Sequence, residues 1–384
     1  MKEVPRTATY CLMLITVGLI GGSLGPSLIY LSALVDATVA EISVVFTAKA
    51  LGNILGAFIA GRVFDRVKGH YYLIIMLLIV AASLFVMPFS GSLVILLVVF
   101  FVMGFAEVSV NIGSNLMTIW LHKGKAGSAV SLLHFCYSIG TMVAPLVLIA
   151  GGYLGGDYGT GYWIIALYTL IFPFVIWFQP SPKYSVSTKD EHSKTFNKAF
   201  FICFLVMVFF YVGFEISIAG WISTYAALNG IEQTKASVLV TWFFLAFACG
   251  RLISVPILRW FALSHIMIVL LATTVLGSVL MSFESVSMTL TALLLGAGCS
   301  AIFPMLFTFS NQVMALTGKL TGYVFTCCGF GAMVIPSLTG PLINAFGAQI
   351  YPYILISMSF IMLLLWFGLR KLAAGDKQDA LLQE

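Results

Sequence analysis

Twelve long apolar runs, separated by short polar gaps, constrain this chain more than any other feature of its sequence. A helix needs about 20 mostly apolar residues to cross the hydrocarbon core of a bilayer. Hydrophobic residues make up 61% of the 384 residues and charged residues 9%, a balance that no soluble fold of this length could bury. The sequence therefore predicts an all-α membrane protein with twelve transmembrane helices, at residues 8–33, 42–64, 71–89, 93–120, 128–151, 162–179, 198–228, 235–258, 262–283, 286–316, 320–345 and 349–371.

The second half of the chain repeats the first at an offset of about 194 residues. Gly56 aligns with Gly250, and Gly104 at the start of a Gly-Phe-Ala-Glu segment aligns with Gly298. Many secondary transporters are built from duplicated helix bundles with the substrate site between the repeats, so transport is the leading interpretation. The predicted domains are an N-terminal six-helix bundle (1–179), a cytoplasmic linker (180–197) and a C-terminal six-helix bundle (198–384).

The basic residues report how the chain is oriented in the membrane. Cytoplasmic loops of membrane proteins carry an excess of Lys and Arg. With a cytoplasmic N-terminus, sixteen Lys and Arg residues fall on the inside and only Lys235 falls in an outside loop. Both termini are therefore expected in the cytoplasm, with the protein in a bacterial inner (plasma) membrane. The net charge of +5 follows from this topology and does not indicate a nucleic-acid partner.

The sequence predicts a protein without enzymatic activity, cofactor or metal cluster. All seven cysteines lie in apolar runs without zinc-like spacing, and no phosphate-binding loop is present. The segment Gly21–Gly25 matches a nucleophile elbow, but that motif needs a strand–turn–helix context. Close contacts between helices explain the spaced glycines better. These pairs are Gly18 and Gly22, Gly21 and Gly25, Gly52 and Gly56, and Gly318 and Gly322.

A charged turn follows the second apolar run, Gly61-Arg62-Val63-Phe64-Asp65-Arg66-Val67-Lys68-Gly69-His70. With twelve helices in two halves, this turn resembles the cytoplasmic Gly-x-x-x-Asp-Arg signature of the major facilitator superfamily. The second glycine falls one position late, and the equivalent turn near Arg259 is degenerate. The resemblance implies that Asp65 and Arg66 form a structural and gating latch. The alternative is a solvated loop that only sets orientation.

Four shorter segments, 46–52, 104–111, 133–146 and 211–225, resemble one branch of that superfamily, the fucose:proton symporters and sodium-dependent glucose transporters. This resemblance implies sugar symport with Glu107 as the coupling carboxylate. The chain departs from the fucose symporters in its first helix, where it has Gly22-Ser23-Leu24-Gly25-Pro26 instead of an acidic residue. A scheme with two coupling carboxylates therefore does not carry over.

Glu107, in the middle of the fourth apolar run, is the leading candidate for coupling. A charged side chain inside a membrane is costly and therefore marks a candidate functional site. Asn111 and Ser114 share its helix face. A carboxyl here could exchange a proton, or it could hold a sodium ion together with amide and hydroxyl oxygens. Lys49 in the second run is the expected counter-charge, in a structural pair, a coupling role or both.

Two further charged residues and one histidine lie inside apolar runs. Glu215 in the seventh run is expected either to face the cavity or to pair with Arg251 of the eighth run. Arg251 is predicted to be a structural or gating charge whose guanidinium reaches toward the cytoplasmic surface. His134 could relay protons or bind a substrate hydroxyl, and a packing role is equally compatible with its position.

The polar residues of the expected cavity helices are mostly uncharged, which suits a neutral polyhydroxylated ligand. Aromatic side chains there offer flat faces for a sugar ring. The predicted substrate-binding residues are Ser23, Ser27, Tyr30, Ser114, His134, Tyr137, Trp221, Thr224, Tyr225 and Asn311.

We therefore expect a monomeric proton- or sodium-coupled symporter that moves a small neutral sugar, such as a hexose, by alternating access in the lipid bilayer. The alternatives are an exporter of drugs or metabolites driven by proton antiport, and a non-transporting membrane sensor or embedded hydrolase.

Overall fold

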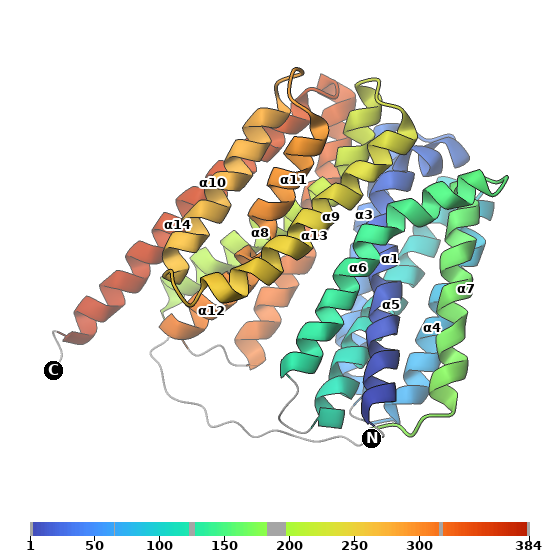
Figure 1. Cartoon of the computed structure of the whole chain (residues 1–384), viewed down its shortest axis with the longest axis horizontal. Helices are drawn as coiled ribbons and strands as arrows, with labels where there is room; N and C mark the ends of the chain where they lie inside the picture. The colour runs from blue at the N-terminus through green and yellow to red at the C-terminus, as the bar shows by residue number, and fades with distance from the viewer. Residues whose placement is uncertain (1–2, 65, 123–126, 183–196, 315–317, 382–384) are drawn as a thin grey trace. The chain divides into compact units, whose positions relative to one another are not determined.

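The computed structural model describes the chain except for residues 1–2, 65, 123–126, 183–196, 315–317 and 382–384. Within the described residues every regular element is a helix (Figure 1). These helices supply twelve segments long and apolar enough to cross a membrane, which confirms the predicted fold class. The elements are α1 (Glu3–Leu34), α2 (Val39–Ile42), α3 (Val44–Phe64), α4 (Gly69–Val86), η1 (Met87–Phe89), α5 (Leu93–His122), α6 (Gly127–Tyr153), α7 (Tyr158–Trp177), α8 (Lys198–Leu228), α9 (Gln233–Ile257), α10 (Leu263–Met281), α11 (Met288–Cys299), α12 (Ile302–Val313), α13 (Gly318–Phe346) and α14 (Ile350–Leu381).

Glycines bring α1 and α6 into close contact. A Cβ atom added to Gly18 would overlap the carbonyl oxygen of Tyr137, and one added to Gly22 would overlap that of Thr141. A side chain at either position would push the two backbones apart, as expected for small residues at membrane helix interfaces. The predicted contact role is wrong for Gly322, which has open space where a side chain would stand.

The tenth apolar run, predicted as one helix over 286–316, consists of α11 and α12 separated by a break at residues 300–301. Ala301 leaves the helical conformation with φ −124° and ψ 6°. Side chains of other helices donate hydrogen bonds to carbonyl groups at the break. The Tyr211 hydroxyl donates to the carbonyl oxygen of Cys299 at 2.9 Å, and Arg251 Nε donates to that of Ser300 at 3.0 Å. Irregular backbone at membrane depth is tolerated when protein groups satisfy it in this way.

Tyr211→Phe should therefore lower the free energy of unfolding by about 1–3 kcal/mol, because it leaves a buried carbonyl group of the break without its donor. Tyr211 is 1% exposed, so water cannot easily replace the missing hydroxyl. Unfolding in a mixed micelle at increasing SDS concentration measures the change. Tyr353→Phe, at a side chain that is 57% exposed, is the matched control and should unfold like the wild type. Equal stability of Tyr211→Phe and the control would contradict this role of the hydroxyl.

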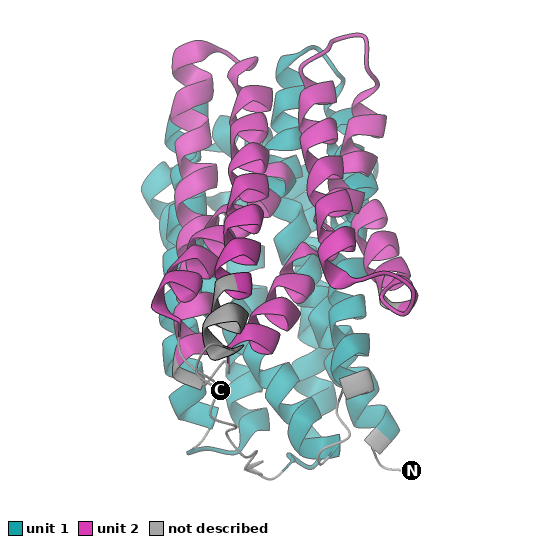
Figure 2. Cartoon of the chain, turned by 90° about the vertical axis from the view of Figure 1, so that its left-hand side faces the viewer, with its two compact units in different colours: residues 1–188, 219–244 teal, residues 189–218, 245–384 magenta. Residues whose placement is uncertain are grey.

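The chain forms two compact units whose boundaries differ from those of the sequence repeat (Figure 2). The first unit comprises Met1–Thr188 and Ala219–Phe244, and the second comprises Lys189–Ile218 and Leu245–Glu384. The last turns of α8 and the first turns of α9 thus belong to the first unit, although the second half of the sequence encodes them.

A polar stripe on α9 attaches its first turns to three helices of the first unit. Gln233 Nε2 donates to the carbonyl oxygen of Pro26 in α1 at 2.9 Å. The Ser237 hydroxyl lies 2.9 Å from that of Tyr158 in α7. Thr241 Oγ1 donates to the carbonyl oxygen of Met142 in α6 at 2.9 Å. Because the three residues are spaced by four, they lie on one face of α9.

Candidate functional site

The candidate site lies where α3 crosses α5 inside the first unit. Glycines make this crossing close. A Cβ atom on Gly52 would overlap the backbone of Phe101 and Phe105, and one on Gly104 would overlap the carbonyl oxygen of Lys49. The near contact of the two backbones brings Lys49, three residues before Gly52, within reach of Glu107, three residues after Gly104.

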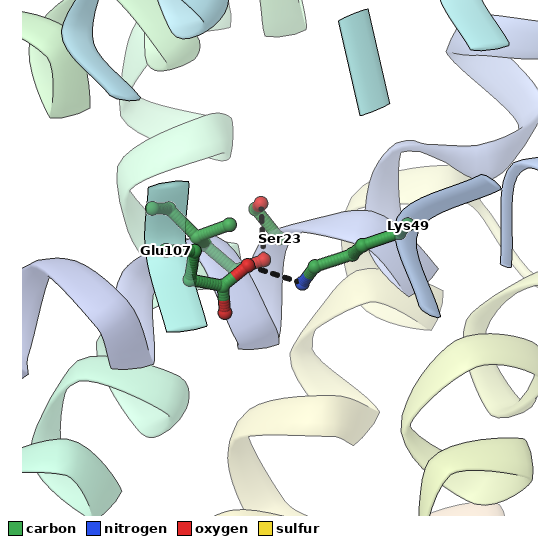
Figure 3. A network of polar contacts seen from close by, with 4 residues as sticks. Ser23, Lys49 and Glu107 are labelled. Carbon is green, nitrogen blue, oxygen red and sulfur yellow. Dashed lines mark hydrogen bonds and ion pairs between the residues drawn. The ribbon is translucent and has the colours of Figure 1, made fainter. Parts of the chain in front are cut away.

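An ion pair between Lys49 and Glu107 forms the centre of the site. Lys49 Nζ lies 3.0 Å from Glu107 Oε2, and the two side chains are 13% and 8% exposed. Ser23 of α1 lies beside the pair and donates its hydroxyl to the carbonyl oxygen of Ile20 at 3.0 Å (Figure 3). The predicted pairing of Lys49 with Glu107 is therefore confirmed.

The electrostatics of the pair limit what can enter the site. Two opposite charges, both largely withdrawn from solvent, balance each other, and removing either partner would leave the other charge buried without compensation. A cation or proton can therefore bind Glu107 at low cost only if the Lys49 ammonium moves away. The arrangement can exchange one positive charge for another, which is the elementary step that ion coupling requires.

Asn111 and Ser114, predicted beside Glu107, differ in their surroundings. Asn115 Nδ2 donates to Asn111 Oδ1 at 3.0 Å and to the Asn111 carbonyl oxygen at 2.9 Å. The Asn111 amide oxygen thus already accepts a hydrogen bond within α5. Ser114 is fully buried, and its Oγ has no hydrogen-bond partner among the described residues.

The predicted substrate residues of α1 lie at different depths in the packing. Ser27 is fully buried, and its hydroxyl lies 2.5 Å from that of Tyr162 and donates within its own helix. Tyr30 is half-buried, with its ring 6.2 Å from that of Tyr158. Of the three predicted α1 residues, Figure 3 shows Ser23 beside the ion pair.

Aromatic side chains pack one helical turn from Lys49. The ring of Phe46 in α3 lies 6.0 Å from that of Trp221 in α8, with an interplanar angle of 34°. Trp221 is fully buried, and the neighbouring Thr224 and Tyr225 are almost fully buried. The predicted aromatic face of α8 thus meets α3 one turn from Lys49, and the Trp221 ring packs against protein in this structure.

His134, Tyr137 and Asn311 were also predicted to bind substrate. His134 is exposed. Tyr137 packs its hydroxyl against Gly21 of α1. Asn311 is an exposed residue of α12 in the second unit. Their predicted contacts with substrate stay predictions.

The second unit holds the other buried charges. Glu215 interacts electrostatically with Arg251 and with Tyr211. Arg251 places its guanidinium 4.4 Å from the centre of the Phe247 ring, in addition to its bond to Ser300. The bond from Arg251 satisfies a carbonyl group at the break between α11 and α12, and the choice between a structural and a gating role of Arg251 stays a prediction.

Of the predicted latch, Arg66 is an exposed turn residue whose N–H donates to the Val63 carbonyl oxygen at 3.0 Å. Asp65 lies outside the described residues.

The sequence reasoning missed Asn53, which lies one turn beyond Lys49 on α3. Its Oδ1 atom is buried and has no hydrogen-bond partner among the described residues. A polar amide four residues after a charged residue in an apolar run was the available signal, because this spacing places both on one helix face.

No group of three or more His, Cys, Asp or Glu side chains that could hold a metal ion occurs in the part of the chain that the structure describes. The seven cysteines are free thiols.

A family model described as Major Facilitator Superfamily matches residues 10–336. Among curated relatives, sodium-dependent glucose transporter 1 of Xenopus laevis is 27% identical, over 93% of this chain and 80% of that protein. Protein TsgA of Shigella boydii serotype 18 is 24% identical, over 81% of each chain.

Solved structures support the same fold. A mutant of the nucleoside transporter NupG superposes with a TM-score of 0.79 at 14% identity, covering 96% of this chain and 99% of that one. A D-xylose–proton symporter superposes with a TM-score of 0.76 at 11% identity, covering 94% and 97%. At these identities the likeness bears on the fold alone.

Proposed function

The chain belongs to the major facilitator superfamily, and we propose that it is a cation-coupled symporter of a small neutral sugar. It is an integral, multi-pass membrane transporter and not an enzyme. The sugar, the coupling cation, the cytoplasmic position of both termini, the bacterial inner membrane and a monomeric state are parts of the proposal.

The buried ion pair of Lys49 and Glu107 carries this proposal. Its charges balance, its oxygen and nitrogen lie 3.0 Å apart, and Ser23 lies beside it. A coupling cation that takes the carboxylate releases the Lys49 ammonium, which has three N–H donors and no acceptor. Those donors match the hydroxyl oxygens of a sugar. Cation and sugar would each favour the state that the other needs, which is reciprocal coupling.

The relatives support the choice of substrate and ion. Sodium-dependent glucose transporters of Xenopus laevis and Mus musculus cover 93% and 83% of this chain. The described residues of the site also fit a neutral ligand, because Glu107 and Lys49 cancel each other's charge and Ser23 offers a hydroxyl.

Transport by purified protein in liposomes tests the proposal. A panel of labelled hexoses is offered under a sodium gradient, a pH gradient or no gradient. We expect one hexose to accumulate under one of the gradients and only to equilibrate without it. If no sugar moves under any gradient, the substrate assignment is wrong. Export of hydrophobic cations driven by a pH gradient would then support the antiporter alternative.

A further inference from the structure

We propose that Asn53 supplies an amide oxygen to a sodium site that it shares with Glu107, and that sodium occupies this site when the Lys49 ammonium leaves. The inference deepens the proposed function, because it rests on Glu107 as the coupling carboxylate and names the ion. Asn53 was not among the residues predicted from the sequence.

The position of Asn53 comes from the close crossing of α3 and α5. Asn53 follows Lys49 by four residues, so both side chains lie on one face of α3. A Cβ atom on Gly104 would stand 3.0 Å from Asn53 Oδ1. Gly104 precedes Glu107 by three residues on α5. Asn53 and Glu107 therefore extend the same contact face of the two helices, about one turn apart.

On this contact face, one buried side-chain oxygen atom accepts no hydrogen bond from the described residues. Asn53 Oδ1 is buried and without a hydrogen-bond partner among the described residues. Glu107 Oε2 lies 3.0 Å from Lys49 Nζ in the ion pair, so it becomes available to another cation when the ammonium leaves. Buried polar atoms are nearly always satisfied in folded proteins, so an unsatisfied amide oxygen about one helical turn from a buried carboxylate calls for an explanation.

The chemistry of these atoms favours sodium over a proton. Hard cations prefer oxygen ligands, and a carboxylate with a neutral amide oxygen is such a set. A proton on Glu107 would neutralise the carboxylate but leave Asn53 Oδ1 without a partner. A sodium ion would use both oxygens and carry the same charge as the ammonium that it replaces.

In this proposal the Lys49 ammonium and the sodium ion compete for the Glu107 carboxylate. Its long side chain is 13% exposed, and no second ion pair of Lys49 or Glu107 is recorded among the described residues. The ammonium can therefore leave the carboxylate without breaking another ion pair. Removing the ammonium should consequently strengthen sodium binding.

Thermal unfolding of the purified, detergent-solubilised full chain tests the site without any sugar. A ligand that binds only the folded state raises the melting temperature with its concentration. The titration uses sodium chloride, with choline chloride at equal ionic strength as the reference. We expect a saturable sodium-specific rise for the wild type, and an apparent sodium affinity at least ~10-fold weaker for Asn53→Leu. Asn53→Asp retains an oxygen and should keep the effect, and Lys49→Met should bind sodium more tightly.

Asn111→Leu separates the two amides. If this variant loses the sodium effect while Asn53→Leu keeps it, the ion is bound at the position predicted from the sequence and Asn53 is not a ligand. If Asn53→Leu does not fold, loss of sodium binding is judged from Asn53→Ser, whose shorter side chain withdraws the oxygen from the crossing.

The outcomes also separate this inference from the proposed function. If the wild type shows no sodium-specific rise but accumulates sugar under a pH gradient, the sodium site is wrong and the symporter proposal stands. If sodium stabilises the protein through Asn53 but no sugar moves in liposomes, the sodium site stands and the proposed substrate is wrong.

Discussion

Glu107→Gln should abolish the accumulation of sugar against its gradient, while the exchange of labelled for unlabelled sugar across the same liposomes stays measurable. A neutral amide has no charge to exchange between the Lys49 ammonium and a coupling cation. The ion then no longer changes the affinity for sugar, and coupling between ligands is typically worth about 5- to 150-fold in affinity. Initial rates and final accumulation under the driving gradient measure the loss.

The matched control for Glu107→Gln is the same change at the other ion pair recorded among the described residues. Glu232 lies 3.6 Å from Lys235, and both side chains are more than half exposed. Exposed pairs of this kind contribute little to stability. Glu232→Gln should therefore accumulate sugar like the wild type. Wild-type accumulation by Glu107→Gln would remove Glu107 from the coupling mechanism.

The same variant should also be less stable, which gives a second and independent measurement. Glu107→Gln leaves the Lys49 ammonium largely buried without its anion, a change that typically costs about 3–5 kcal/mol. The double variant Glu107→Gln/Lys49→Met removes both charges and should recover most of that stability in SDS unfolding, but not the accumulation. If the double variant is no more stable than the single one, an unpaired Lys49 is not the cause.

Gly52→Ala should have the largest effect on the fold, because the added methyl group would overlap backbone atoms of α5. The nearest atoms are the carbonyl group of Phe101 and the nitrogen of Phe105, neither of which can rotate away. Overpacking commonly costs about 1–3 kcal/mol and more where nothing can yield. We expect a loss at the upper end of this range in SDS unfolding, together with loss of coupled transport as α3 separates from α5.

Gly61→Ala is the control for Gly52→Ala, because both glycines lie in α3 and Gly61 has open space where a side chain would stand. Alanine is the better helix former by about 1 kcal/mol, so Gly61→Ala should be equally or slightly more stable than the wild type. If Gly52→Ala unfolds like Gly61→Ala, the α3–α5 crossing is looser than the structure shows.

The sequence predicted the membrane helices well, because hydrophobicity along a segment largely decides whether it crosses a bilayer. The predicted run 198–228 has the bounds of α8, and the run 93–120 ends two residues before α5 does. The break at residues 300–301 was missed because Met288–Val313 is apolar throughout, and hydropathy does not register which carbonyl groups lack a helical donor. Those carbonyl groups are satisfied by Tyr211 and Arg251, which are distant in sequence.

Of the candidate site, the ion pair was predictable from the sequence, whereas the surroundings of the amide side chains were not. A lysine and a glutamate inside apolar runs must find partners, and this rule was sufficient to pair Lys49 with Glu107. The surroundings of the amides depend on packing. Asn111 shares a helix face with Glu107 but accepts a hydrogen bond from Asn115. Asn53 lies at the crossing only because Gly104 leaves room for it. Periodicity within one helix does not show where a glycine of a neighbouring helix leaves room for its side chains.

The boundary between the compact units bears on how the duplicated halves could be inherited or exchanged. The sequence repeat changes over in the linker, whereas α8 continues from one unit into the other near residue 218. Gln233 and Thr241, encoded by the second repeat, donate to carbonyl groups of Pro26 and Met142 in the first. In a chimera that joins halves of two different transporters at the linker, the hydrogen-bond donors to those carbonyl groups would come from the other protein. Each half of the sequence thus supplies hydrogen-bond partners to the same compact unit, so neither half contains all the contacts of one unit.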